Sequence, residues 1–403
     1  MHRKAQDEGS KQRPEKPMFD DEQTPVVPIV PTAPKSPPIP TTGIKQFRCS
    51  GGFAGSFAPN FGKPCCDFTS NMLEAKWSRE FGWDPMYMVP FQNLSLSPGS
   101  RVILQGQQVY DVIQATMGFD NRIRLFRPDQ HLQRLRRTAA KLSLPDFDEH
   151  ELLICVKRLV LSDASFIPPA YTNGSLEVRI MFIGPEPNNK ITMSREATLY
   201  AFMIRHSSQS VAEYKRSKIV YADPKYSRAW IGSLAQYKTS ANIAPTFYVT
   251  DIANGLGCND VLWLYGKEEH VLDFNEANVF IFIINDRNKK ELITPPLNGL
   301  IVPGITRQSI LEMVRYWNEF TVSERSISIH ELRTLQRQRR LLEIIATNVM
   351  GNAIPVIRIH YESTRTDIHI PSLEHREPLW ERLNRALHSI EFGLVDHPWG
   401  LII

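Results

Sequence analysis

The sequence of 403 residues predicts a mixed α and β fold, of the α+β or α/β class, in two domains. Its length exceeds that of one ordinary hydrophobic core, for which about two domains are expected. Strand-like alternation and helix-like stripes both occur, and a polar segment without either period separates two globular stretches. We expect an N-terminal extension at 1–65, a small α/β domain at 66–205, a linker at 206–217 and a larger domain at 218–403.

The extension at 1–65 is not expected to form a packed core. Residues 1–45 are rich in Pro, Lys, Asp and Glu, and seven prolines fall between Pro25 and Pro40. Such a composition cannot bury enough apolar surface to offset the entropy lost on ordering. We therefore expect this Pro-rich extension to be disordered or extended.

The small domain begins at about residue 66, where apolar periodicity starts. Residues 128–144 predict a helix that begins at a proline and carries one apolar stripe, formed by Leu132, Leu135, Ala139 and Leu142, with Arg134, Arg137 and Lys141 off it. Residues 175–184 alternate between apolar and polar side chains, which indicates a half-buried strand. Residues 198–204 indicate a second, more apolar strand.

The large domain is expected to mix strands and helices in the same way. Apolar runs predict strands at 261–265, 279–284 and 355–360, and apolar stripes predict helices at 307–317, 328–337 and 379–387. The polar segment at 206–217 precedes all of them and is the expected domain boundary.

Composition excludes several classes of function. The net charge of +4 is small for this length and no basic stripe occurs, so no nucleic-acid partner is expected. No apolar run approaches the ~20 residues that span a bilayer. Five cysteines without a Cys-x-x-Cys pair favour a reduced compartment, and no metal site is predicted. Acidic residues among the first sixteen favour a cytoplasmic location, with a mitochondrial one as the alternative.

The most informative segment is Tyr237-Lys238-Thr239-Ser240-Ala241-Asn242, which follows Ala222-Asp223-Pro224-Lys225-Tyr226-Ser227-Arg228-Ala229-Trp230. Further blocks occur in order at 71–83, 90–96, 124–128, 182–187, 261–266, 294–299, 302–307, 322–325 and 369–372. Together they resemble the eukaryotic branched-chain amino acid aminotransferases over roughly residues 67–403. The resemblance implies the two-domain class IV fold (D-amino acid aminotransferase-like) of enzymes that use pyridoxal 5′-phosphate (PLP), with a smaller N-terminal and a larger C-terminal domain.

The resemblance also implies residues that bind PLP. Lys238 matches the lysine that forms the Schiff base with the cofactor and moves a proton during the reaction. Arg127 matches the arginine that binds the cofactor phosphate, and the backbone N–H groups of Ile305 and Thr306 match the rest of that anion site. Asp273 matches the glutamate that keeps the pyridine nitrogen protonated, and is one methylene shorter.

Three residues are implied at the substrate side of the site. Arg179 matches an arginine at the mouth of the active site, while Gln105 and Glu177 stand where the family has tyrosines. The implied reaction moves the amino group of leucine, isoleucine or valine to 2-oxoglutarate. A homodimer is implied by the resemblance alone.

Departures from the family pattern gather around the same positions. Ile243 replaces a tyrosine that bonds the cofactor ring oxygen, Glu276 replaces a threonine, and Val349 replaces a residue with a hydroxyl. These changes leave open a catalytically weakened or inactive paralogue that acts as a binding, structural or dimer-partner protein. A third reading keeps the PLP chemistry and changes the substrate.

Overall fold

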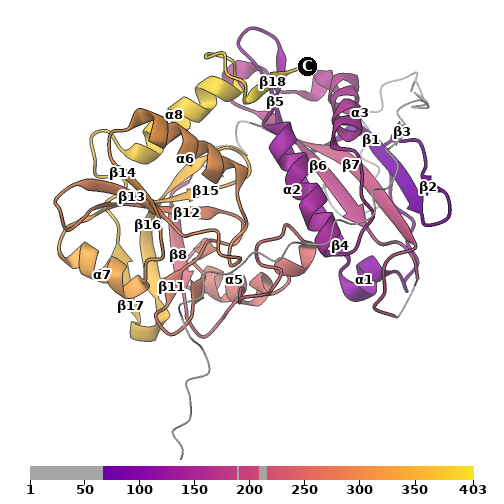
Figure 1. Ribbon diagram of the computed structural model, residues 1–403. Coiled ribbons are helices and arrows are strands. Elements are labelled where there is room, and N and C mark those ends of the chain that lie inside the picture. The colour runs from indigo at the N-terminus through magenta and orange to yellow at the C-terminus, as the bar shows by residue number, and fades with distance from the viewer. Residues whose placement is uncertain (1–66, 188–189, 208–215) are drawn as a thin grey trace, which may run out of the picture. The chain divides into compact units, whose positions relative to one another are not determined.

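The computed structural model describes residues 67–187, 190–207 and 216–403. The predicted extension at 1–65 and most of the predicted linker at 206–217 lie outside these residues. Within them the chain forms two large sheets with helices, which confirms the predicted mixed class (Figure 1).

The first sheet is antiparallel throughout and has eight strands in the described part of the chain. Its main path runs β18-β5-β4-β6-β7-β1-β2, and β3 pairs with β1. The strands are β1 (Asp67–Ser78), β2 (Gly82–Trp83), β3 (Tyr87–Pro90), β4 (Gln108–Met117), β5 (Ile123–Phe126), β6 (Ser175–Ile183), β7 (Glu196–His206) and β18 (Gly400–Ile402).

Helices α2 (Pro128–Lys141) and α3 (Glu149–Ser162) pack against the first sheet (Figure 1). The apolar stripe predicted for residues 128–144 supplies this contact, because Leu132, Leu135 and Ala139 are buried in one core with the strands. Helix α2 begins with Pro128, whose missing N–H costs nothing at the first helical position. Helix α1 (Arg101–Gln105) is a short element before β4.

The second sheet is mixed, with parallel pairs between β13 and β14, β16 and β8, and β8 and β9. Its main path runs β14-β13-β12-β15-β16-β8-β9, and β17 pairs with β16. The strands are β8 (Lys218–Ala222), β9 (Asp260–Val261), β12 (Asn278–Ile284), β13 (Lys290–Thr294), β14 (Thr321–Glu324), β15 (Leu341–Thr347), β16 (Ala353–Tyr361) and β17 (Thr366–His369).

Four helices accompany the second sheet in the described residues: α5 (Thr246–Gly255), α6 (Ile305–Trp317), α7 (Ile329–Arg337) and α8 (Leu379–Glu391). Helices α6 and α8 share one core with β12 and β15, and α7 shares a second core with the other side of the same strands. Single 3-10 turns occur at Ala164–Phe166, Ala170–Thr172, Ser240–Asn242 and Glu362–Thr364.

Two features differ from the sequence-based expectation. The strand predicted at 261–265 is wrong as one element, because Val261 pairs with β8 whereas β10 (Leu264–Tyr265) pairs with β11 (His270–Val271). The last strand, β18, joins the first sheet through β5, which the sequence did not predict. The division into domains at 66–205 and 218–403 stays a prediction.

The first sheet reaches the lysine-containing segment directly. An isolated bridge pairs Val109 of β4 with Thr239, and the Tyr110 N–H donates to the Lys238 carbonyl at 3.1 Å. Strand β4 therefore fixes the backbone at Lys238 and Thr239. No helix in the described ranges has the length and apolar character needed to cross a membrane.

Candidate active site

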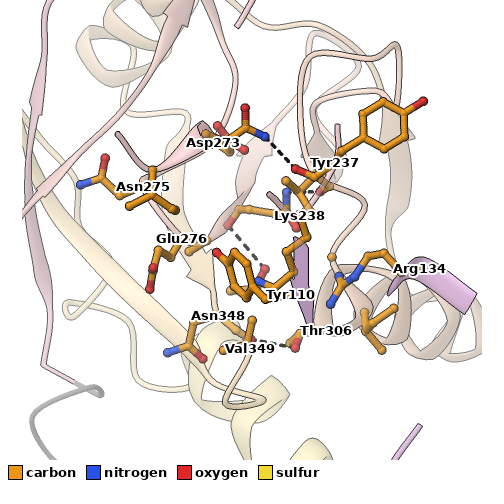
Figure 2. Close-up of a pocket in the computed structure, with 18 of the residues that line it drawn as sticks. Tyr110, Arg134, Tyr237, Lys238, Asp273, Asn275, Glu276, Thr306, Asn348 and Val349 are labelled. Atoms are coloured by element: carbon orange, nitrogen blue, oxygen red, sulfur yellow. Dashed lines mark hydrogen bonds between the residues drawn. The ribbon is translucent and has the colours of Figure 1, made fainter. Parts of the chain in front are cut away.

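A pocket of about 630 Å³, including its open mouth, surrounds the Lys238 side chain (Figure 2). Side chains from β4, α2, the 228–243 segment, the 273–278 turn, the start of α6 and the 347–349 turn contribute to it. The lining residues are Tyr110, His131, Arg134, Arg228, Tyr237, Lys238, Thr239, Asn242, Ile243, Asp273, Asn275, Glu276, Ala277, Asn278, Val302, Gly304, Ile305, Thr306, Thr347, Asn348 and Val349.

The backbone around Lys238 is held by a side-chain amide. Asn242 Nδ2 donates to the carbonyl oxygens of Leu234 and Tyr237, each at 2.7 Å, and so closes the turn that carries the lysine. On the other side, Lys238 Nζ lies 4.7 Å from the centre of the Tyr110 ring (Figure 2). A cation over an aromatic face is attracted by the ring quadrupole, so Tyr110 orients the side chain as well as the backbone.

The environment of Lys238 favours the neutral amine. Burial lowers its pKa to about 8, and the positive charge of Arg134 acts in the same direction. The carboxylates of Asp111, Glu276 and Glu177 oppose this shift without cancelling it. A lysine that is partly neutral near physiological pH can act as a nucleophile or a base, as an ordinary surface lysine cannot.

The structure does not bring Arg127 into the pocket. Its guanidinium donates to both carboxylate oxygens of Glu312, at 3.0 and 3.1 Å, and to Ser309 Oγ at 3.0 Å. It also stacks 4.7 Å from the centre of the Trp399 ring. Arg127 has a φ of 43° and stands at the cap of α2, so its side chain leaves the helix toward α6. Arg127 therefore does not line the cavity in this structure, and its predicted role at the cofactor phosphate stays a prediction.

Arg134, two turns further along α2, lines the pocket instead (Figure 2). Its Nε and Nη2 each donate to Asp111 at 2.8 Å, and its Nη1 donates to the Pro303 carbonyl at 3.0 Å. The side chain is almost fully buried, although the sequence pattern assigned it to the polar side of the helix. The sequence does contain one indication of this position: Arg134 follows His131 by three residues, and residues three apart lie on the same face of a helix.

The N-terminal end of α6 forms part of the cavity wall. Gly304, Ile305 and Thr306 all line the cavity, and phosphate binding by the N–H groups of the last two stays a prediction. The first N–H groups of a helix have no acceptor within it, and the helix dipole adds positive potential there. Thr306 Oγ1 donates to the Asn348 carbonyl at 2.8 Å and so joins this end to the 347–349 turn. The arrangement suits an anionic group.

Gly304 packs closely against the side chain of Asn278. A Cβ on it would overlap Asn278 Oδ1, and Asn278 in turn donates from Nδ2 to the Val302 carbonyl at 2.9 Å. The close packing brings the backbone before α6 up to the cavity wall.

Asp273 lines another part of the pocket (Figure 2). It is paired with Arg228. Arg228 Nη2 donates to Asp273 Oδ1, and both side chains are almost fully buried. Burial raises the pKa of Asp273, and Arg228 counteracts that rise. The pair places a carboxylate with a fixed countercharge at the cavity wall, and sequence reasoning had identified only the aspartate.

Two buried polar atoms of pocket residues have no hydrogen-bond partner within the described residues. These are Thr239 Oγ1 and Arg228 Nε. Unpaired buried polar atoms cost free energy, so they mark places where a bound polar molecule would be stabilised. Together with Arg134 and the start of α6, they make this cavity suitable for a ligand that carries acceptors.

The residues predicted for the substrate side do not line the cavity. Arg179 Nε donates to Glu177 at 2.7 Å, and Glu177 also lies 3.0 Å from His206 Nε2. Gln105 is the exposed last residue of α1. Glu177 still acts on the site through its charge, because it raises the pKa of Lys238. Direct contacts of these three residues with a substrate stay a prediction.

The departures noted in the sequence do reach the cavity. Ile243, Glu276 and Val349 all belong to its lining. Ile243, Val349, Ala277 and Val302 contribute an apolar part, whereas Glu276 is exposed at the mouth. The cavity thus combines an apolar portion with the N-terminal end of α6 and a buried lysine.

Comparison with known proteins identifies the same region. The family model for class IV aminotransferases (Amino-transferase class IV) matches residues 108–359, which include β4, Lys238 and the start of α6. Among solved structures, a branched-chain aminotransferase from Thermoproteus uzoniensis with norvaline has a TM-score of 0.65 at 18% identity, covering 82% of this chain and 99% of that one. The PLP form of a branched-chain amino acid aminotransferase from Thermobaculum terrenum has a TM-score of 0.63 at 16% identity, covering 83% and 98%. These likenesses show the fold.

Sequence relatives extend the comparison. The chain is 37% identical over 347 residues to the mitochondrial branched-chain-amino-acid aminotransferase of Mus musculus, which covers 86% of both chains. It is 36% identical over 334 residues to the cytosolic form of Rattus norvegicus, covering 83% of this chain and 80% of that one. The predicted cytoplasmic location stays a prediction, since relatives of both compartments match. With this identity over most of its length, the chain belongs to the branched-chain-amino-acid aminotransferases, an enzyme family of class IV aminotransferases.

Proposed function

We propose that this chain transfers the amino group of leucine, isoleucine or valine to 2-oxoglutarate, with PLP held on Lys238. The observation that carries the proposal is the partly neutral Lys238, with a pKa of about 8, between a buried carboxylate and a helix N-terminus in one cavity. The names of the relatives support the same class of substrate. The apolar part of the cavity suits branched aliphatic side chains.

The residues of the cavity fit PLP. Arg134 and the N–H groups of Ile305 and Thr306 would hold the phosphate, because a cation and free backbone donors are what a phosphate requires. Asp273 would hold the ring nitrogen in its protonated form, with Arg228 fixing the carboxylate. The Lys238 amine would hold the cofactor by condensing with its aldehyde, with loss of water. When bound, PLP supplies an electron sink that weakens the bonds to the amino acid Cα.

The chain itself then moves the proton. The Lys238 amine, neutral for part of the time at pH 7, can accept a proton from the substrate Cα and return it. Tyr110 restricts the lysine by its ring and by the N–H that it donates to the Lys238 carbonyl. The cavity wall formed by Ile243 and Val349 limits access of water to the apolar part.

An assay of the purified protein with PLP tests the proposal. L-Leucine and 2-oxoglutarate should give glutamate, L-isoleucine and L-valine should do the same, and L-lysine or L-aspartate should give at least about tenfold less, since an apolar cavity leaves a buried charge unpaired. The visible absorption of lysine-bound PLP should fall when leucine is added alone. Absence of both this band and glutamate formation would refute the proposal.

The rate at which PLP attaches to Lys238 should depend on pH. Only the neutral amine attacks a carbonyl, so the rate should rise as pH increases and should reach half its limit near pH 8, the pKa of Lys238. Below that pH the ammonium form dominates and attachment slows. Stopped-flow absorbance over a pH series measures this. A midpoint near the ordinary lysine value of 10.5 would contradict the assigned environment.

We also propose a homodimer. The segment that carries Lys238 and the following helix expose four large apolar side chains, namely Trp230 (59%), Ile231 (74%), Phe247 (70%) and Tyr248 (66%). Exposed apolar surface of this kind is typical of protein interfaces. Sedimentation should give twice the chain mass, and Phe247→Asp should shift the protein toward the monomer. A wild-type protein that sediments as a monomer at micromolar concentration would refute it.

A further inference from the structure

A fully buried carboxylate lies behind the anion-binding end of the cavity. Asp111 of β4 has no solvent exposure and accepts hydrogen bonds from two residues of α2. Its Oδ1 lies 2.7 Å from His131 Nδ1 and 2.8 Å from Arg134 Nη2, and its Oδ2 accepts from Arg134 Nε at 2.8 Å. The Val112 N–H donates to the same Oδ1 at 2.8 Å. Four donors thus converge on one carboxylate.

This network fixes the Arg134 guanidinium in one orientation. Nε and Nη2 form a two-pronged pair with Asp111, and Nη1 donates to the Pro303 carbonyl, 169 residues away in the sequence. A bidentate arginine–carboxylate pair restricts rotation as well as position. Since Pro303 immediately precedes Gly304, the same contacts set the distance between the guanidinium and the start of α6. The geometry of the anion site therefore depends on Asp111.

His131 completes the network on the other side. Its ring lines the cavity and is buried, and burial lowers its pKa, so the neutral ring donates from Nδ1 to Asp111. Burial alone would raise the pKa of Asp111, but Arg134 and His131 together hold it well below its usual range. The carboxylate is consequently charged, and it balances the charge of Arg134 inside the protein.

The same carboxylate acts on Lys238. The charged groups that influence the lysine are Arg134, which lowers its pKa, and the carboxylates of Asp111, Glu276 and Glu177, which raise it. If the Asp111 charge were removed, one of the carboxylates that raise the pKa of Lys238 would be lost, while Arg134 would still lower it. The pKa of Lys238 should then fall below about 8.

We propose that Asp111 and His131 are positioning residues, which orient Arg134 toward the start of α6 and thereby set the affinity of the cavity for a phosphate group. The inference rests on the proposed function, because PLP is the phosphate-bearing ligand considered. Neither residue needs to touch the ligand. Their effect is specific for the phosphate, whereas a merely structural role would affect all ligands of the cavity alike.

The test compares PLP with pyridoxal, which lacks the phosphate. Dissociation constants are measured by absorbance for the wild type, Asp111→Asn, His131→Leu and the charge-retaining Asp111→Glu. Asp111→Asn should weaken PLP binding by about 10- to 100-fold, the equivalent of one misplaced charge-assisted contact, and pyridoxal binding by less than about threefold. His131→Leu should give a smaller loss in the same direction, and Asp111→Glu should recover part of the affinity.

A matched control separates positioning from folding. Asp163 is another buried carboxylate, which accepts hydrogen bonds from Asn71 and does not line the cavity. Asp163→Asn should lower the melting temperature and leave the ratio of the two affinities unchanged. In Asp111→Asn the pH midpoint of PLP attachment should also move below that of the wild type. If Asp111→Asn fails to fold, His131→Leu and Asp111→Glu carry the comparison.

The outcomes are distinct. A fall in the preference for PLP over pyridoxal in the Asp111 and His131 variants, with none in Asp163→Asn, supports the proposal. Equal losses for both ligands, or unchanged affinities, overturn it while the proposed function stands. A wild-type protein that binds neither ligand overturns the proposed function and this inference with it.

Discussion

Lys238→Ala should abolish the visible absorption of lysine-bound PLP and reduce transamination by about 10²- to 10⁴-fold or more, the range that loss of a general acid–base group alone produces. The structure gives the reason, since the Lys238 amine has a pKa of about 8 and lies among the residues that would hold the cofactor. Spectra of the purified variant with added PLP, and initial rates with leucine, measure the two effects.

The variant should remain folded. The pKa of Lys238 is about 8 in the folded chain against an ordinary value of 10.5, so its positive charge opposes folding. This cost is fully present below about pH 8 and disappears as pH rises to 10.5, where the amine is neutral in both states. Loss of PLP binding with an unchanged or higher melting temperature at pH 7 is the expected combination.

Lys141→Ala is the matched control. Lys141 is exposed on α2 and does not line the cavity. Its Nζ lies 5.5 Å from the centre of the ring of Tyr237, the residue that precedes Lys238. This variant should keep the absorption band and the rate. If Lys238→Ala retained the band, another lysine would have to carry the cofactor and the assignment would be wrong.

Arg134→Gln should reduce the affinity for PLP by about 10- to 100-fold, because it removes a charge-assisted contact worth roughly 1.5–3 kcal/mol. It should also destabilise the fold, since the buried Asp111 carboxylate would lose its main countercharge. PLP titration and thermal melting of the same preparation measure both effects.

Arg127→Gln provides the contrast that decides between the two arginines. Arg127 donates to Glu312 and stacks on Trp399 outside the cavity. Its replacement should lower stability by about 1 kcal/mol, through loss of a partly exposed ion pair and a cation–π contact, and should leave PLP affinity unchanged. A loss of PLP affinity in Arg127→Gln with none in Arg134→Gln would support the phosphate role that the sequence predicts for Arg127 and contradict the one proposed for Arg134.

The two arginines differ in where the structure places their side chains. Arg127 and Arg134 are seven residues apart, but Arg127 precedes α2 with a φ of 43°, whereas Arg134 lies within the helix. The motif around Arg127 resembled the family, and the pattern could not tell which of the two guanidiniums meets the start of α6. That meeting depends on Pro303, whose carbonyl contacts Arg134 across 169 residues.

The alternation of apolar and polar residues likewise predicted the structure of a single strand but not its contacts with the neighbouring strand. It predicted the strand at 175–184, which the structure has as β6, and it predicted that Glu177 and Arg179 share a face. It could not show that His206, from the neighbouring β7, would also engage Glu177 and draw both charges away from the cavity lining. Which residues lie opposite each other on two strands depends on the register of the pair, and the alternation within one strand does not identify those partners.

The sequence by itself determined the mixed α and β class, and it predicted that Lys238 and the turn before α6 belong to one site, because these depend on local motifs and on periodicity within one element. Tertiary structure alone decided which charges face the cavity. The pairs Asp111–Arg134 and Arg228–Asp273 join residues 23 and 45 positions apart. These pairs form because a charged group that is buried away from water needs a countercharge close to it in space, whatever the distance between the two residues in the sequence.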